Sequence, residues 1–86
     1  MATMDIATMK GRFREGLLQS AIISPLNPEA DSWCFFAVDM EGQIAAMAIA
    51  RTTTQKFYSS VDAAVGDAFR IGFKTVTVQA QQGAAA

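Results

Sequence analysis

The sequence predicts an α+β fold: an antiparallel β-hairpin, extended by a C-terminal strand into a sheet of three or four strands, with two helices packed on it. Three observations support this prediction. Residues 60–71 carry apolar side chains at helical spacing between a serine and a glycine. Residues 32–39 and 43–54 are β-like runs joined by a short polar turn. Residues 74–79 alternate again, which predicts a last strand in a single small domain over residues 1–79.

The first predicted helix covers residues 5–20, after a frayed start at residues 1–4. Asp5 is its candidate cap, and Gly11 and Gly16 weaken it by roughly 1 kcal/mol each relative to alanine. We therefore expect this helix to depend on docking for its stability. Its apolar stripe consists of Ile6, Met9, Phe13 and Leu17.

Residues 21–31 are predicted to be a connector, in which the part before Asn27 could form a brief extended piece. Pro25 and Pro28 are incompatible with a continuing helix or a central strand. Glu29 and Asp31 could offer oxygens to a metal ion, but calcium-loop spacing is missing and a solvated turn is the preferred interpretation. At the other end of the chain, residues 80–86 lack periodicity and are expected to be disordered.

The predicted hairpin is apolar on both of its faces. In the first run, Trp33, Phe35 and Ala37 face one way, and Cys34, Phe36 and Val38 face the other. The second run is again apolar on both sides, and Gly42 is suited to the turn between the runs. The two helices could cover opposite faces, or they could share one face and leave the other for a second subunit. The pattern alone does not decide between these arrangements.

The segment RTTTQKFY, residues 51–58, changes abruptly from apolar to polar. One interpretation is a nucleic-acid or phosphate contact, with Arg51 and Lys56 neutralising charge and Tyr58 stacking on a base. Lys10, Arg12 and Arg14 of the first helix could add to such a surface. The other interpretation is the exposed end of a strand, with a bend near residues 53–54 that leads into a third short strand.

The second helix has the clearest boundaries. Ser59 or Ser60 can cap its start, and Gly72 can end it in a left-handed conformation. The side expected to pack inward consists of Val61, Ala64, Val65, Ala68, Phe69 and Ile71. The opposite, solvated side consists of Asp62, Ala63, Gly66, Asp67 and Arg70.

Composition excludes several kinds of site. The chain has no histidine, and Cys34 is its only cysteine, so an internal disulfide, a Cys/His zinc site and a His-dependent catalytic triad are excluded. We expect Cys34 to be a buried, inert thiol and the protein to be a non-enzyme without metal or cofactor. No apolar run approaches the length of a membrane span, and the N-terminus does not resemble a targeting segment, so a soluble cytoplasmic protein is expected.

These observations favour a small interaction or regulatory module that forms a homodimer, because 86 residues must hide two apolar faces of a hairpin. Nucleic-acid binding through residues 51–58 is the alternative, although a net charge of −1 offers no general attraction to it. A small ligand bound between helix and sheet is a third possibility, without a signature of its own.

Overall fold

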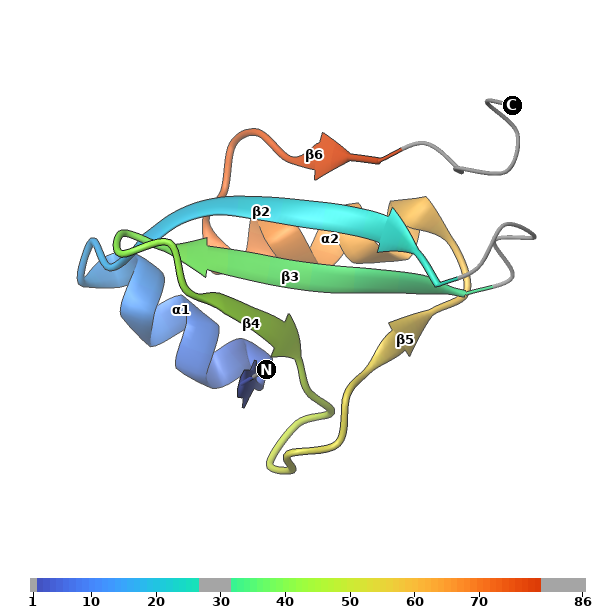
Figure 1. Ribbon diagram of the computed structural model, residues 1–86, viewed down its shortest axis with the longest axis horizontal. Coiled ribbons are helices and arrows are strands. Elements are labelled where there is room, and N and C mark those ends of the chain that lie inside the picture. Colours follow the sequence, from blue (N-terminus) through green and yellow to red (C-terminus); the bar gives the residue numbers. More distant parts are fainter. Residues whose placement is uncertain (1, 27–31, 80–86) are drawn as a thin grey trace.

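The computed structural model describes residues 2–26 and 32–79, which form a twisted sheet with two helices on one side (Figure 1). The elements are β1 (Ala2–Met4), α1 (Ile6–Arg14), β2 (Leu18–Pro25), β3 (Trp33–Asp39), β4 (Ile44–Met47), β5 (Phe57–Tyr58), α2 (Val61–Ile71) and β6 (Thr77–Val78). This arrangement confirms the α+β class. The predicted tail at residues 80–86, together with Pro28, Glu29 and Asp31, lies outside the described residues.

The sheet has six strands, more than the three or four predicted. Its order is β1-β4-β3-β2-β6, with β5 pairing on β3 beside the end of β4. The central strand β3 is antiparallel to β2, β4 and β5. The outer strands β1 and β6 run parallel to β4 and β2, respectively. The predicted hairpin is thus the centre of a mixed sheet.

The first helix is shorter than predicted. Asp5 caps it as expected, since its carboxylate accepts a hydrogen bond of 3.0 Å from the amide of Thr8. The helix ends at Arg14 instead of residue 20, because Gly16 adopts a positive φ of 77° that turns the chain into β2. Leu17 therefore lies outside the apolar stripe and is exposed. Residues 2–4 are a strand and not a frayed end.

The prediction of a connector over residues 21–31 is wrong for its first half. Ala21–Pro25 belong to β2, which lies inside the sheet between β3 and β6. Pro25 is tolerated because it is the last residue of β2, opposite Trp33 and beyond the positions that pair with β6. The strand signal of Ile22 and Ile23 was therefore masked by the neighbouring proline.

The turn between β3 and β4 forms as predicted. Gly42 has a φ of 85°, and the carboxylate of Asp39 accepts hydrogen bonds from the amides of Glu41 (2.9 Å) and Gln43 (2.8 Å). Strand β4 stops at Met47, short of the predicted end at residue 54. The chain then projects as a loop closed by the bridge between Ala48 and Gln55, and it returns as the predicted third short strand, β5.

The second helix is confirmed, with two exceptions in its orientation. Ser60 caps it through the amide of Ala63 (3.2 Å), and Gly72 ends it with a φ of 129°. Phe69, predicted to pack inward, is 59% exposed, whereas Asp67, predicted to be solvated, is only 7% exposed. Asp67 is turned toward β5, where it has polar partners, and this orientation leaves Phe69 at the rim.

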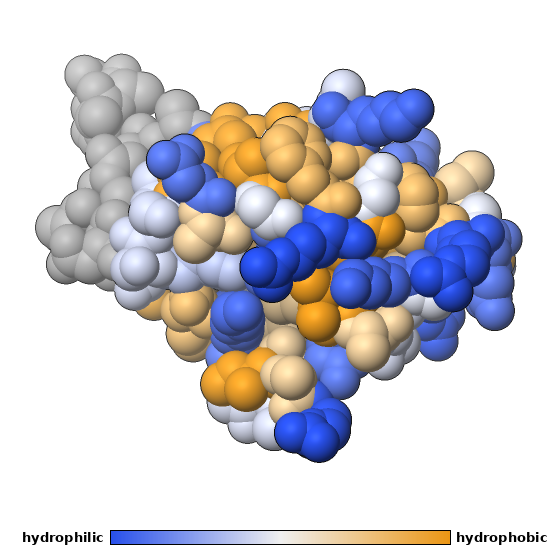
Figure 2. Space-filling view, turned by 180° about the vertical axis from the view of Figure 1, so that it is seen from behind, coloured by the Kyte–Doolittle hydropathy of each residue, from blue (hydrophilic) through white to orange (hydrophobic). Residues whose placement is uncertain are grey.

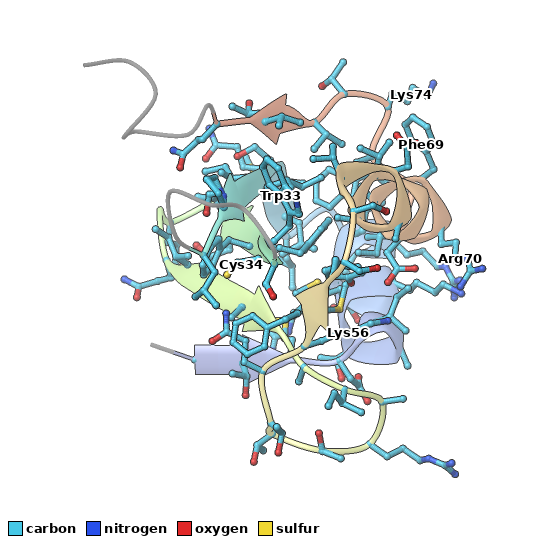
Figure 3. The ribbon with its side chains drawn as sticks, turned by 90° about the vertical axis from the view of Figure 1, so that its right-hand side faces the viewer. Trp33, Cys34, Lys56, Phe69, Arg70 and Lys74 are labelled. Carbon is cyan, nitrogen blue, oxygen red and sulfur yellow. The ribbon has the colours of Figure 1, made fainter. Side chains whose placement is uncertain are left out.

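Both helices cover the same face of the sheet, so of the two arrangements that the sequence pattern allowed, the helices adopt the one with a shared face. Figure 3 shows the sheet edge-on, with both helices on one side. The core lies between the two layers, and its largest fully buried side chains are those of Met9, Ile23, Phe35 and Met47. We call this side of the sheet the covered face and the other the open face. In the described residues, neither helix is long and apolar enough to cross a membrane.

Candidate interaction surface

The open face carries no charged side chain among the described residues. Directly paired residues share a side of a sheet, so the strand register assigns its members. These are Thr3, Ser20, Ile22, Ser24, Cys34, Phe36, Val38, Ile44, Ala46, Phe57, Thr77 and Gln79. The sheet thus presents a wide surface on which every side chain is apolar or neutral.

The centre of the open face is apolar. Phe36 of β3 has Ile22 of β2 on one side and Ala46 of β4 on the other. Ile44 and Phe57 project further, with 46% and 48% of their surface exposed. Contiguous apolar surface of this kind is typical of a protein interaction site, whereas single exposed apolar residues are common everywhere.

A hollow of about 180 Å³ opens on the same face. It is lined by Ile22, Ser24, Phe36, Ile44 and Gln79, which come from four neighbouring segments of the sheet. Three of these side chains are apolar and the other two are neutral amide or hydroxyl groups. The hollow therefore suits an uncharged, apolar group.

Cys34 lies on the open face, between Phe57 and Ser24 in neighbouring strands. Its predicted burial is confirmed, because it is only 5% exposed, and desolvation raises the pKa of its thiol. A raised thiol pKa keeps the group protonated and weakly nucleophilic near neutral pH.

The charged side chains of the described residues lie elsewhere. None of the seven lysines and arginines belongs to the open face, and Figure 2 shows the helical side, where hydrophilic side chains are spread among apolar ones. Lys10, Arg12 and Arg14 are carried by α1. Arg51 lies in the loop after β4, with a positive φ of 63° and its amide donating to the carboxylate of Asp5 at 2.9 Å.

The proposed nucleic-acid residues come from three segments of the chain: α1, the loop after β4, and the residues in and next to β5. Of that set, β5 brings Lys56 and Tyr58 together, since residues two apart in a strand share a side. Tyr58 is only 5% exposed, so its ring is not accessible for the base stacking that the sequence suggested. The polar segment instead supplies a structural contact with α2.

Lys56, Tyr58, Asp67 and Arg70 form a connected group that we call the Asp67 cluster. Asp67 Oδ2 accepts hydrogen bonds from the Tyr58 hydroxyl (2.7 Å) and from Lys56 Nζ (3.3 Å). Arg70 Nη1 lies 3.5 Å from Asp67 Oδ1, and Lys56 Nζ lies 4.9 Å from the centre of the Tyr58 ring. Figure 3 shows Lys56 and Arg70 extending from β5 and α2 on the helical side of the sheet.

The electrostatics of this cluster favour a neutral tyrosine. Burial raises the pKa of Tyr58 most, and the hydrogen bond to Asp67 and the negative charge of Asp67 raise it further, while Arg70 opposes them. Two cations beside one buried carboxylate compensate for its desolvation. Helical periodicity placed Asp67 on the solvated side, so its burial could not be predicted from the pattern of α2. The only indication in the sequence was that Lys56 and Tyr58, two residues apart in an extended segment, present two hydrogen-bond donors on one side.

A second carboxylate, Asp5, connects three parts of the fold. It accepts backbone hydrogen bonds from Thr8 in α1 and from Arg51 in the projecting loop, and these bonds lower its pKa. The loop is held on the same side by Thr3, whose hydroxyl donates to the carbonyl of Thr53 at 3.1 Å. Both carboxylate oxygens of Asp5 thus accept a backbone hydrogen bond.

Over residues 2–26 and 32–79, no three His, Cys, Asp or Glu side chains converge in a way that could hold a metal ion. Comparison of the chain with the profiles of known protein families, with curated proteins and with solved structures found no match. The open face and the Asp67 cluster are consequently interpreted from their own chemistry.

Proposed function

We propose that the protein is a non-enzymatic interaction module that forms a homodimer by packing the open faces of two sheets against each other. The observation that supports this proposal is the uncharged, apolar-centred open face of a chain whose lysines and arginines all lie elsewhere. Depletion of charge is the compositional mark of the buried centre of an interface.

A second copy is the occupant that the chemistry of the face favours. Two copies related by a two-fold axis meet through identical surfaces, so any charge on the face would lie near its own symmetry mate. The open face has no such charge and therefore meets itself without repulsion. A nucleic acid, in contrast, gains most of its affinity from cations near its phosphates, and this face offers none.

The size of the face agrees with a reversible dimer. The seven residues of β3 span about 24 Å at about 3.4 Å each, and five strands spaced by about 4.8 Å cover about 20 Å. Because β1, β4 and β6 are shorter than β3, the face offers at most about 500 Å² per copy, or at most about 1,000 Å² for the pair. This total lies at the lower end for specific interfaces, so we expect micromolar and concentration-dependent association.

Sedimentation equilibrium over a range of protein concentrations tests the proposal, with one substitution on the face and one off it. Ile44 on the open face and Ile49 in the projecting loop are equally exposed, at 46% and 47%. We expect Ile44→Lys to weaken dimerisation at least about tenfold, because it places like charges in the interface, and Ile49→Lys to leave it unchanged. A monomer at high micromolar concentration, or equal effects of both substitutions, would overturn the proposal.

The alternative of nucleic-acid binding can be tested with the same purified protein and variants. It would require Arg51, Lys56 and the cations of α1 to act on the helical side, without stacking by the buried Tyr58. Binding to single-stranded RNA or DNA that weakens steeply with salt, and is lost on Arg51→Ala but retained in Ile44→Lys, would favour it.

A further inference from the structure

We infer that Phe57 is the anchor of the dimer, and that the Phe57 ring of each copy fills the hollow on the open face of the other. This inference rests on the proposed homodimer and specifies how its two faces engage. Phe57 is an aromatic side chain that is 48% exposed, and it lies on a surface without charged side chains among the described residues. Aromatic side chains seated in apolar pockets near the centre of an interface contribute most of the binding energy in many complexes.

The hollow has the size and chemistry to receive a phenyl ring. Its volume is about 180 Å³, and a protein cavity of about 150 Å³ is enough to bind benzene. Ile22, Phe36 and Ile44 provide apolar walls, and Phe36 can meet an incoming ring edge-to-face. The neutral groups of Ser24 and Gln79 complete the lining without presenting a charge to an aromatic ring.

The positions of Phe57 and the hollow allow both contacts to form at once. Phe57 pairs with Cys34 from one side of β3, and Ser24, which lines the hollow, pairs with Cys34 from the other side. Consider a two-fold axis that lies between the two faces, parallel to both, and that crosses the line from ring to hollow at its midpoint and at a right angle. Rotation about this axis places the Phe57 ring of one copy over the hollow of the other. The same operation that places one Phe57 in the opposite hollow then places the other, which makes a closed dimer with two identical anchors.

The Asp67 cluster on the covered face determines the orientation of Phe57. Strand β5 consists only of Phe57 and Tyr58. Tyr58 and Lys56, the residue before the strand, both point to the helical side, where both bind Asp67 Oδ2. Side chains alternate along a strand, so holding Lys56 and Tyr58 inward holds Phe57 outward. Asp67 is in this sense a positioning residue for a contact on the opposite side of the sheet.

Substitution of Phe57 is the first test, because the chain offers a matched control. Phe69 is comparably exposed, at 59%, but lies on α2, on the helical side. Sedimentation equilibrium should show dimerisation weakened at least about tenfold by Phe57→Ala and less than about twofold by Phe69→Ala. If both have equally small effects while Ile44→Lys disrupts the dimer, the anchor is wrong and the face-to-face dimer stands. If Ile44→Lys also has no effect, the dimer itself is overturned.

Direct observation of the contact is the second test. In a dimer mixed from isotope-labelled and unlabelled chains, isotope-filtered NMR spectra should show intermolecular nuclear Overhauser transfer between the Phe57 ring and the methyl groups of Ile22 and Ile44. The Phe69 ring should show no such transfer. Transfer from Phe57 to residues outside the hollow would overturn the proposed seating of the ring.

The positioning role of Asp67 is tested by non-additivity. We expect Asp67→Asn to weaken dimerisation several-fold in the natural chain, but not to weaken it further in a chain that already carries Phe57→Ala. Asp62→Asn, on the exposed side of the same helix, should have no effect. If Asp67→Asn does not fold, Tyr58→Phe removes one of the same contacts at lower cost. Equal effects with and without Phe57 would overturn the positioning role.

Discussion

The two faces of β3 differ in what covers them and not in how apolar they are. Phe35 is fully buried beneath the helices, and the adjacent Phe36 lies on the open face, in the wall of the hollow. The covered face forms the core, and its burial stabilises the fold of a single chain. The open face has comparable side chains, and in residues 2–26 and 32–79 no second layer covers them; the proposed dimer would bury them.

Charge distinguishes the surroundings of the two faces more clearly than hydropathy does. The covered face is bordered by the Asp67 cluster, in which a carboxylate and two cations are held in fixed contacts. The open face has no ionisable side chain among its described members except the thiol of Cys34. A surface that is to be buried against a copy of itself must avoid charge, whereas the rim of a core can use paired charges to fix its geometry.

The largest expected difference between the faces lies in the two adjacent phenylalanines. Phe35→Ala should lower the free energy of unfolding by about 3–5 kcal/mol, because it leaves a cavity in the only core of the described chain. Phe36→Ala should cost clearly less in dilute solution, where the open face is already in contact with water. Urea denaturation at low micromolar concentration measures both.

The dependence of stability on protein concentration is a second test of the difference between Phe35→Ala and Phe36→Ala. The proposed dimer would stabilise the folded chain by mass action, so the unfolding midpoint of the natural chain and of Phe35→Ala should rise with concentration. Phe36→Ala should lose most of that dependence. Equal destabilisation by the two substitutions at every concentration would remove the distinction between the faces.

The sequence predicted the hairpin, α2 and the α+β class because their signals are local. Gly42, Ser60 and Gly72 each mark a boundary by the backbone conformation or cap that they supply. Both apolar faces of β3 were also readable, since alternation along a strand is strict. These elements needed no knowledge of the rest of the chain.

The elements that were missed depend on distant partners. β1 is three residues long, and it exists because β4 offers it unpaired backbone groups. The last strand was predicted over residues 74–79 and forms as the shorter β6. Ile22 and Ile23 indicated a strand, but the nearby Pro25 suggested a connector, and only pairing with β3 decides between the two. Asp67 is likewise buried because Tyr58 and Lys56 face it, which helical periodicity cannot show.

The Asp67 cluster gives the next largest effect on the covered face. Tyr58→Phe removes the donor at 2.7 Å from Asp67 and keeps the packing of the ring. Since hydrogen bonds to charged groups contribute about 1.5–3 kcal/mol, we expect a loss of that order in the free energy of unfolding. Asp62→Asn, which removes only a charge from the exposed first turn of α2, should cost less, about 0.3–1 kcal/mol. A neutral effect of Tyr58→Phe would mean that the bond does not form in solution.

Two glycines test how tightly the helical layer is packed. A Cβ at Gly72 would lie 2.6 Å from Phe13 Cε1, and the φ of 129° is unfavourable for other residues, so Gly72→Ala should cost about 1–3 kcal/mol. A Cβ at Gly66, inside α2, would meet nothing within 4 Å. Gly66→Ala should therefore raise the free energy of unfolding by about 0.5–1 kcal/mol. Thermal unfolding of both variants measures this difference, and a gain for Gly72→Ala would contradict close packing of α1 against α2.

Tyr58 also allows the covered face to be followed alone at high pH, because it is the only tyrosine in the chain. Its folded pKa is raised by burial and by Asp67, so above pH about 10 the unfolded chain loses this proton while the folded chain retains it. The stability linked to this group is complete below that pH and falls above it by about 1.4 kcal/mol per pH unit. Tyrosinate absorbance should therefore appear only as circular dichroism reports unfolding, whereas in urea it should appear near pH 10. Ionisation near pH 10 with the fold intact would show that the covered face admits water at Tyr58.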